Sequence, residues 1–144
     1  SGFIMPSHFT ESVGELILSC DTSGSMYPHY RLLFGEISRI CQLVKPEAVR
    51  VLWWDTKVHG EQIFEPADFQ AIGSLLKPKG GGGTRVSCVS EYINKQQIKA
   101  DAVVVFTDGY VESDVDWRIS SPTLWLVTEA SHWVPPAGKK VMFN

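Results

Sequence analysis

Residues 15–25 read Glu-Leu-Ile-Leu-Ser-Cys-Asp-Thr-Ser-Gly-Ser. The first six are mostly apolar and the run ends abruptly in small polar residues, as a buried strand does where it enters a loop. A helix is expected next, because Pro28 suits a first turn and apolar residues then recur at spacings of three and four until Lys45-Pro46. This succession of strand, loop and helix is the start of the pattern on which the predicted fold rests.

The same alternation continues along the chain. Strands are expected at residues 49–54, 57–64, 102–106 and 123–127, with a short last strand at 141–143. Helices are expected at residues 66–76 and 86–93, separated by the glycine run 80–83. The strand at 57–64 is more polar and follows a tight turn, which is typical of a sheet edge. The pattern predicts an α/β fold of the Rossmann-like type, with a doubly wound, mostly parallel sheet, flanking helices and one antiparallel edge strand.

Composition favours a single globular domain. The chain has 144 residues, of which 44% are hydrophobic and 20% charged, and its formal net charge is −3 without any basic stretch. Nucleic acid is therefore not expected as a partner. No apolar run is long enough to span a membrane, so no membrane partner is expected either. The three cysteines form no CxxC or zinc-binding pattern, which favours buried reduced thiols and a cytoplasmic protein.

Oxygen-bearing side chains follow two of the predicted strands and the glycine run. They are Asp21, Ser23 and Ser25, then Thr84, then Asp108. Because the carboxyl ends of parallel strands gather at one rim of such a sheet, we expect these residues to meet there. Their oxygens suit Mg²⁺, Mn²⁺ or Ca²⁺ and do not suit a thiophilic metal. Five such groups leave room in a six-coordinate shell for an outside ligand, and two carboxylates leave the ion able to attract a further carboxylate.

Residues 21–25, Asp-Thr-Ser-Gly-Ser, resemble the DxSxS signature of von Willebrand factor A (VWA) domains. Thr84 and the Thr107-Asp108-Gly109 turn resemble the other two segments of that signature, in the same order and after elements of the expected type. Together they look like a complete metal-ion-dependent adhesion site (MIDAS). The resemblance implies that the three hydroxyl residues bind the cation and that the two aspartates complete its shell, directly or through water. It also implies a module that grips an Asp or Glu carboxylate of a protein partner and is not an enzyme.

The chain is similar to the compact intracellular VWA-like domains of bacteria and phages. These often form the C-terminal part of a longer protein and in some cases work beside AAA+ ATPases, so an AAA+ ATPase is an expected partner. The expected domain covers residues 3–144. Because the chain begins with Ser1-Gly2 rather than with Met, we expect these two residues to be remnants of cloning and the natural polypeptide to be longer.

Alternative functions fit parts of the pattern. Asp21 at the end of a strand also suits the nucleophile of a Mg²⁺-dependent phosphohydrolase of the haloacid dehalogenase type, but Ser23 stands where that chemistry needs an acid/base carboxylate. A purely structural module whose metal site has lost its use is a further alternative. Simple helix capping explains Asp21 and Ser23 without a metal, yet it does not predict Thr84 and Asp108.

Several residues near these segments are expected to have more ordinary roles. Tyr27 and His29 follow the first segment directly and are candidates for the rim of the site. Trp117 and Trp133 lie in irregular stretches and are candidates for exposed contacts. The acidic group at 112–116 is expected to be a solvated loop.

Overall fold

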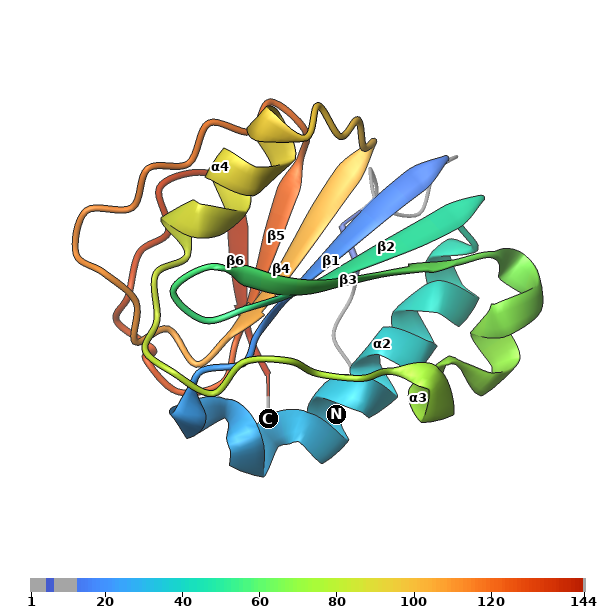
Figure 1. Cartoon of the computed structure of the whole chain (residues 1–144), viewed down its shortest axis with the longest axis horizontal. Coiled ribbons are helices and arrows are strands. Elements are labelled where there is room, and N and C mark those ends of the chain that lie inside the picture. Colours follow the sequence, from blue (N-terminus) through green and yellow to red (C-terminus); the bar gives the residue numbers. More distant parts are fainter. Residues whose placement is uncertain (1–4, 7–12, 144) are drawn as a thin grey trace.

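The computed structural model describes residues 5–6 and 13–143, which form one six-stranded sheet with helices on both faces (Figure 1). The strands are β1 (Glu15–Asp21), β2 (Ala48–Trp54), β3 (Val58–Phe64), β4 (Ala102–Thr107), β5 (Thr123–Val127) and β6 (Lys139–Met142). Neighbouring strands are parallel except β2 and β3, which pair antiparallel at one edge. The predicted sheet, with its one antiparallel edge strand, is therefore confirmed. Ser1 and Gly2 lie outside the described residues, and the expectation about them stays a prediction.

The central strands are buried on both faces. All residues of β4 and β5 are buried, as are all of β1 after its first residue. Branched and aromatic side chains dominate these strands, as is usual where helices or loops cover both sides of a parallel sheet. In β3, by contrast, half-buried and exposed residues alternate until Phe64. This pattern is that of an edge strand, as the sequence predicted.

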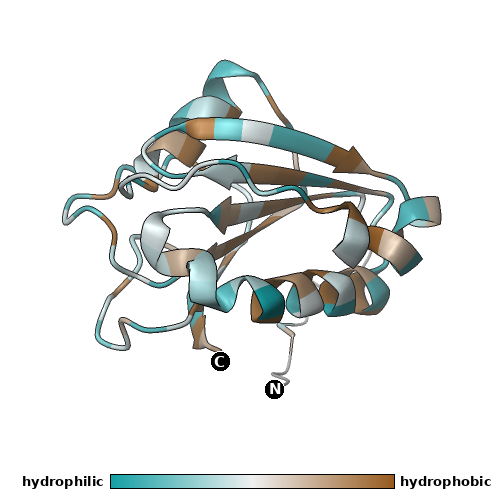
Figure 2. Cartoon of the chain, turned by 60° about the horizontal axis from the view of Figure 1, so that its bottom comes forward, coloured by the Kyte–Doolittle hydropathy of each residue, from teal (hydrophilic) through white to brown (hydrophobic). Residues whose placement is uncertain are grey.

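Helices cover one face of the sheet much more completely than the other. The first face carries η1 (Gly24–His29), α2 (Tyr30–Val44), η2 (Pro66–Ala71) and α3 (Ile72–Leu75), and the second carries α4 (Ser87–Lys95). Figure 2 shows the amphipathic character of α2, whose apolar residues, among them Ile37 and Ile40, pack on the sheet. Pro28 lies inside the 3-10 turn that precedes α2, rather than in the first turn of the α-helix itself. No helix in the described ranges is long and apolar enough to cross a membrane.

Two irregular segments complete the second face. Residues 108–122 and 128–138 connect β4 to β5 and β5 to β6 without forming a helix. Each places a tryptophan against the buried Trp125: the ring centroid of Trp117 lies 4.8 Å from that of Trp125, and the ring centroid of Trp133 lies 5.3 Å from it. Trp117 and Trp133 are half-buried and pack on the core. The prediction of exposed contacts at these two positions is therefore wrong.

The strand order reverses between β1 and β4. From β1 the chain continues to β2 and β3 on one side, and it later returns to add β4, β5 and β6 on the other side. In open α/β sheets, ligands usually bind outside the carboxyl ends of the strands at such a reversal. Asp21 is the last residue of β1 and Asp108 directly follows β4. The topology therefore brings both predicted carboxylate ligands to the position where this fold most often binds a ligand.

Candidate metal centre

Four of the five predicted ligand residues form one hydrogen-bonded cluster at the carboxyl end of the sheet. The backbone amide of Ser23 donates to Oδ1 of Asp21 at 2.8 Å. The hydroxyl oxygens of Ser23 and Ser25 lie 3.2 Å apart, and the Ser25 hydroxyl donates to Oδ2 of Asp108. Ser25 reaches Asp108 because η1 begins at Gly24, directly after the β1 loop. Two segments that lie more than 80 residues apart in the chain thus contribute to one group of oxygens.

Both carboxylate oxygens of Asp21 accept hydrogen bonds. The second donor is the hydroxyl of Thr107, at 2.7 Å from Oδ2, a role that the sequence analysis did not assign to Thr107. Burial raises the pKa of Asp21 from 3.8 to about 6, although the bonds from Ser23 and Thr107 act in the opposite direction. The nearby charge of Asp108 raises this pKa further. In the absence of a cation the two carboxylates therefore repel each other.

Neither buried aspartate has a basic partner. Asp21 and Asp108 are fully buried, and neither forms an ion pair with a Lys, Arg or His among the residues that the structure describes. Burying a carboxylate without a compensating charge is costly, and burying two together is more so. A divalent cation would balance both charges. All the side-chain oxygens of the cluster are hard ligands, so these residues fit Mg²⁺, Mn²⁺ or Ca²⁺.

The neutral hydroxyls are an essential part of this donor set. Within the described residues, no group of three or more His, Cys, Asp or Glu side chains is arranged to hold a metal ion. A cation at Asp21 and Asp108 therefore depends on Ser23, Ser25 and Thr84 for its remaining protein ligands. This is the donor set that the resemblance to a MIDAS implies.

The glycine run brings Thr84 towards the cluster. Between α3 and α4 the chain passes η1 (Figure 1), and the amide of Gly24 donates to the carbonyl of Gly82 at 3.2 Å. Thr84 follows two residues later and is half-buried. No hydrogen bond joins its hydroxyl to the other four predicted ligands in the described chain. The structure thus places the loop of Thr84 beside the cluster without a direct contact of the Thr84 hydroxyl.

Asp55, which follows β2, holds the glycine run in position. Its Oδ2 accepts the amide of Gly82 at 3.0 Å, and its backbone carbonyl accepts the amide of Arg85 at 2.9 Å. These two bonds lie on either side of Thr84 in the chain. Oδ1 of Asp55 lies 2.6 Å from Nε2 of His59. Burial raises the pKa of Asp55, but the hydrogen bonds that it accepts outweigh burial and leave the pKa below its ordinary value. Asp55 lies in the tight turn that precedes the edge strand, and the sequence pattern there indicates a turn and does not predict this role.

Thr22 fixes the beginning of the same run. Its hydroxyl lies 2.7 Å from the carbonyl oxygen of Trp54 and 2.9 Å from that of Lys79. Gly80 follows with a φ of 144°, and a Cβ atom at this position would lie only 2.0 Å from Oγ1 of Thr22. Glycine is therefore required at position 80 both by the backbone conformation and by the close approach of Thr22.

Comparison with known proteins identifies the family. A family model described as "VWA-like domain (DUF2201)" matches residues 16–144. The chain belongs to this family. Membership confirms the VWA-like assignment made from the signature and supports a protein-interaction module in general. The MIDAS and the bacterial or phage intracellular type stay predictions. None of the curated proteins compared with the chain matches it.

A solved structure shares the fold of this VWA-like domain. It is the crystal structure of an aerotolerance-related membrane protein from Bacteroides fragilis NCTC 9343 with multiple mutations to serines. The two chains are 13% identical, the TM-score is 0.64, and the match covers 91% of this chain and 92% of that chain. At this level of identity the similarity shows the fold alone.

Gly80→Ala and Gly81→Ala form a matched pair that tests how the run positions Thr84. Both glycines have positive φ, 144° and 123°, so both substitutions introduce backbone strain of the order of 1–3 kcal/mol. A Cβ at position 80 meets Thr22, whereas nothing lies within 4 Å of a Cβ at position 81. We expect Gly80→Ala to weaken Mg²⁺ binding, measured by calorimetry, about tenfold more than Gly81→Ala does. Equal affinities in two folded variants would contradict this role of Thr22.

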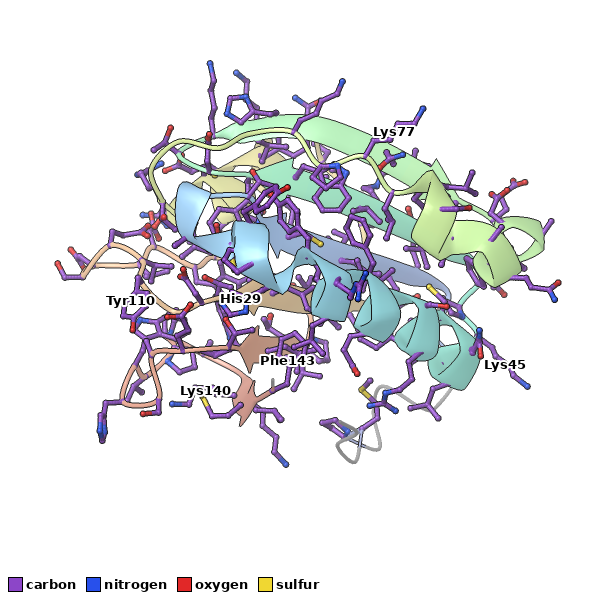
Figure 3. All side chains as sticks on the ribbon, turned by 90° about the horizontal axis from the view of Figure 1, so that it is seen from below. His29, Lys45, Lys77, Tyr110, Lys140 and Phe143 are labelled. Carbon is purple, nitrogen blue, oxygen red and sulfur yellow. The ribbon has the colours of Figure 1, made fainter. Side chains whose placement is uncertain are left out.

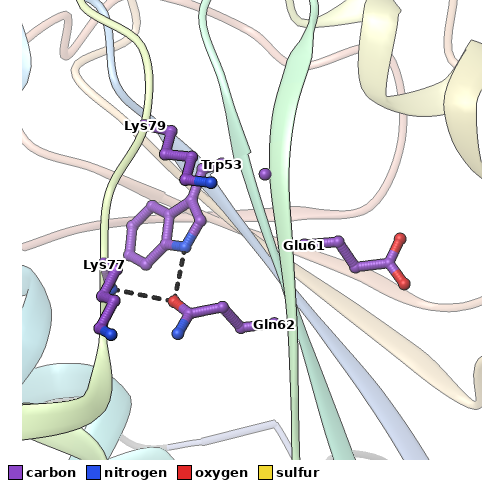
Figure 4. Close-up of a pocket in the computed structure, with 6 residues that line it drawn as sticks. Trp53, Glu61, Gln62, Lys77 and Lys79 are labelled. Carbon is purple, nitrogen blue, oxygen red and sulfur yellow. Dashed lines mark hydrogen bonds between the residues drawn. The ribbon is translucent and has the colours of Figure 1, made fainter.

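A small pocket of the VWA-like domain lies outside the cluster. It has a volume of about 100 Å³ and is formed between β3 and the segment before the glycine run (Figure 4). Oε1 of Gln62 accepts the indole N–H of Trp53 and the amide of Lys77, each at 2.9 Å. None of the five predicted ligand residues lines this pocket. The candidate metal centre is therefore a site at the end of the sheet and does not coincide with this pocket.

Glu112 caps α4 in the VWA-like domain and is not part of a solvated loop. Its carboxylate oxygens accept the amides of Val86 and Ser87 at 2.8 and 2.9 Å, and also the Ser87 hydroxyl. Amides at a helix N-terminus lack partners within the helix, and a carboxylate there also interacts favourably with the helix dipole. The prediction of a solvated acidic loop at 112–116 is therefore wrong for Glu112. This contact ties the segment after Asp108 to the helix that follows the loop of Thr84.

Proposed function

We propose that this VWA-like domain binds one divalent cation, Mg²⁺ in the first instance, and uses it to grip an Asp or Glu carboxylate of a protein partner. The observation that carries the proposal is the pair of fully buried carboxylates, Asp21 and Asp108, which have no basic partner among the described residues. Ser23 and Ser25 add neutral oxygens to the same cluster. In this proposal Thr84, which directly follows the glycine run, supplies the last of the five protein ligands.

The charge of the donor set accounts for a grip on an acidic partner. Asp21 and Asp108 balance the two positive charges of the cation, and the hydroxyl ligands add none. Because the site then carries no excess negative charge, it does not repel a further anion, and an open position on the cation can take a carboxylate oxygen. The Ser25 hydroxyl can serve as one of the protein ligands of the cation. Its proton is donated to Asp108, and its oxygen keeps lone pairs that can bind the cation.

Partner capture under four conditions tests the proposal. Wild type and Asp21→Ala serve as baits in lysate of the native host, each with Mg²⁺ and with EDTA. The expected partner is retained only by wild type with Mg²⁺, and the resemblance implies an AAA+ ATPase as one candidate. A partner retained equally in all four conditions would place the gripping surface elsewhere on the domain.

We expect no phosphatase activity from the domain. Asp21 is fully buried and both of its oxygens accept hydrogen bonds, which disfavours attack on a phosphate. Ser23 also stands where the phosphohydrolase alternative needs a proton-transferring carboxylate. The assay compares hydrolysis of a generic aryl phosphate by wild type and Asp21→Asn with Mg²⁺. Metal-dependent turnover that disappears in Asp21→Asn would favour the phosphohydrolase instead.

A further inference from the structure

Exposed apolar side chains stand on three of the segments that are connected to the candidate metal centre. They are Tyr27, Tyr110 and Val134, whose exposed fractions are 78%, 58% and 80%. We call these three residues the apolar rim. Single exposed apolar residues are ordinary on a protein surface, so their exposure alone indicates little. What makes these three informative is that each lies on a segment that hydrogen bonds connect to the segments of the predicted ligands.

Hydrogen bonds connect the rim to the predicted ligands. Tyr27 lies in η1, two residues after Ser25, and the amide of Tyr110 donates to Oδ1 of Asp108 at 3.0 Å. In Figure 3, Tyr110 and His29, the last residue of η1, lie towards the same end of the molecule. The first two rim residues therefore belong to the segments that contain Ser25 and Asp108.

The loop of Val134 is connected to the same place. The amide of Ala130 donates to the carbonyl of Asp108 at 2.8 Å, and the amide of Trp133 donates to the carbonyl of Ala130 at 3.1 Å. His29 Nε2 lies 2.6 Å from a carboxylate oxygen of Glu129, which joins this loop to η1. All three loops of the rim are thus linked around Asp108.

The rim residues project from backbone that is held in place. Nζ of Lys140 donates to the carbonyls of Ser131 and Trp133 at 2.6 and 2.7 Å, and Trp133 packs on the core. On the other side, the ring centroid of Tyr27 lies 5.9 Å from that of Tyr30. A surface that is already ordered loses little conformational entropy when a partner binds. These contacts favour a preformed docking surface.

We infer that the partner segment carries its carboxylate directly beside a large aliphatic or aromatic side chain. The inference rests on the proposed function, because the carboxylate occupies the open position of the cation. A single ionic contact that water surrounds contributes little to affinity, whereas apolar contacts around it exclude water and strengthen it. Tyrosines beside a charged centre are typical of residues that contribute most to an interface. The cation thus selects an Asp or Glu of the partner segment, and Tyr27 and Tyr110 select the apolar residue next to it.

A randomised peptide library tests this inference. Seven-residue peptides with Asp, Glu, Asn or Gln at the centre and random flanks are selected on immobilised wild type with Mg²⁺. We expect Asp or Glu at the centre, an apolar residue enriched next to it, and loss of all selection in EDTA. The Tyr27→Ser/Tyr110→Ser double variant is expected to keep the Mg²⁺ affinity and the choice of acid, to lose the apolar enrichment, and to bind the best peptide at least about tenfold more weakly.

The control is Ile63→Ser on β3, because Ile63 is as exposed as Tyr110, at 58%, and lies at the edge of the sheet. This variant should select the same peptides as wild type. Selection of acidic peptides without an apolar neighbour, or an apolar preference that survives in the double variant, would overturn the inference and leave the proposed function standing. If Mg²⁺ produces no preference for acidic peptides, the proposed function fails as well. Mg²⁺-dependent self-association in sedimentation would assign the rim to a second copy of the chain and overturn the inference.

Discussion

Millimolar Mg²⁺ or Mn²⁺ is expected to raise the midpoint of thermal unfolding of this VWA-like domain, and EDTA is expected to reverse the rise. A ligand that binds the folded state alone stabilises it by mass action, by about 2.7 kcal/mol when its concentration is one hundred times the dissociation constant. For a domain of this size the corresponding rise is roughly 5–10 °C. The physical cause is the neutralisation of Asp21 and Asp108, which are buried without a basic partner in the described chain.

Differential scanning calorimetry over a series of metal concentrations measures this effect. NaCl at matched ionic strength is the control, because general screening of surface charge would also change the midpoint. A midpoint that responds equally to NaCl and to Mg²⁺, together with no heat of binding at millimolar Mg²⁺, would show that the assigned residues do not hold a cation.

Asp21→Asn is expected to change stability in opposite directions with and without metal. The side-chain amide introduced at position 21 keeps an oxygen that can accept the Ser23 N–H. The substitution also removes one of the two carboxylate charges that repel each other. Burial raises the pKa of Asp21 from 3.8 to about 6, which corresponds to roughly 3 kcal/mol of destabilisation by the charged form at neutral pH. In EDTA the variant should therefore be more stable than wild type, by up to about that amount. With Mg²⁺ it should be less stable, because it no longer holds the cation.

The pH dependence of this difference has a defined sign. The pKa of Asp21 is higher in the folded state than in the unfolded state, so its contribution to stability is fully present below its ordinary value of 3.8 and is lost as the pH rises through about 6. In EDTA the advantage of Asp21→Asn should thus be largest at neutral pH, shrink as the pH falls below about 6, and disappear only below 3.8. Chemical denaturation of both proteins across this range measures it. A metal-free variant that is less stable than wild type at neutral pH would contradict the account.

The strands, the helices and the position of the candidate metal centre could be predicted from the sequence. They depend on local hydrophobic patterns and on the rule that ligands bind at the carboxyl ends of parallel strands. The apolar run of β1 and the helical spacing of α2 are continuous in sequence, so both elements were evident from the residues alone. Asp21 and Asp108 each follow such a strand, and the rule that ligands bind at the carboxyl ends of parallel strands places them together. The hydrogen bond from Ser25 to Asp108 agrees with that expectation.

The parts that sequence reasoning missed depend on contacts between distant segments. Asp55 accepts the amide of Gly82, and Glu112 accepts the amide of Ser87, at separations of 27 and 25 residues without any periodic pattern. Asp55 also directly follows a strand, β2. The rule that residues at the carboxyl ends of parallel strands lie together could therefore have indicated its position near Asp21. No such signal exists for Trp117 and Trp133, because the segments that contain them form neither helix nor strand in the described structure.

A crystal of this domain grown with Mn²⁺ would show whether the cluster holds a cation, because the anomalous scattering of manganese locates the ion without reference to the protein. We expect one strong anomalous peak at the carboxyl end of β1 and β4, about 2 Å from the hydroxyl oxygens of Ser23 and Ser25. Thr84 is expected to have moved within reach of the ion, and the two aspartates to bind it directly or through water. A map with no peak in this cluster, or with manganese bound only elsewhere, for example beside Asp55 and His59, would contradict it.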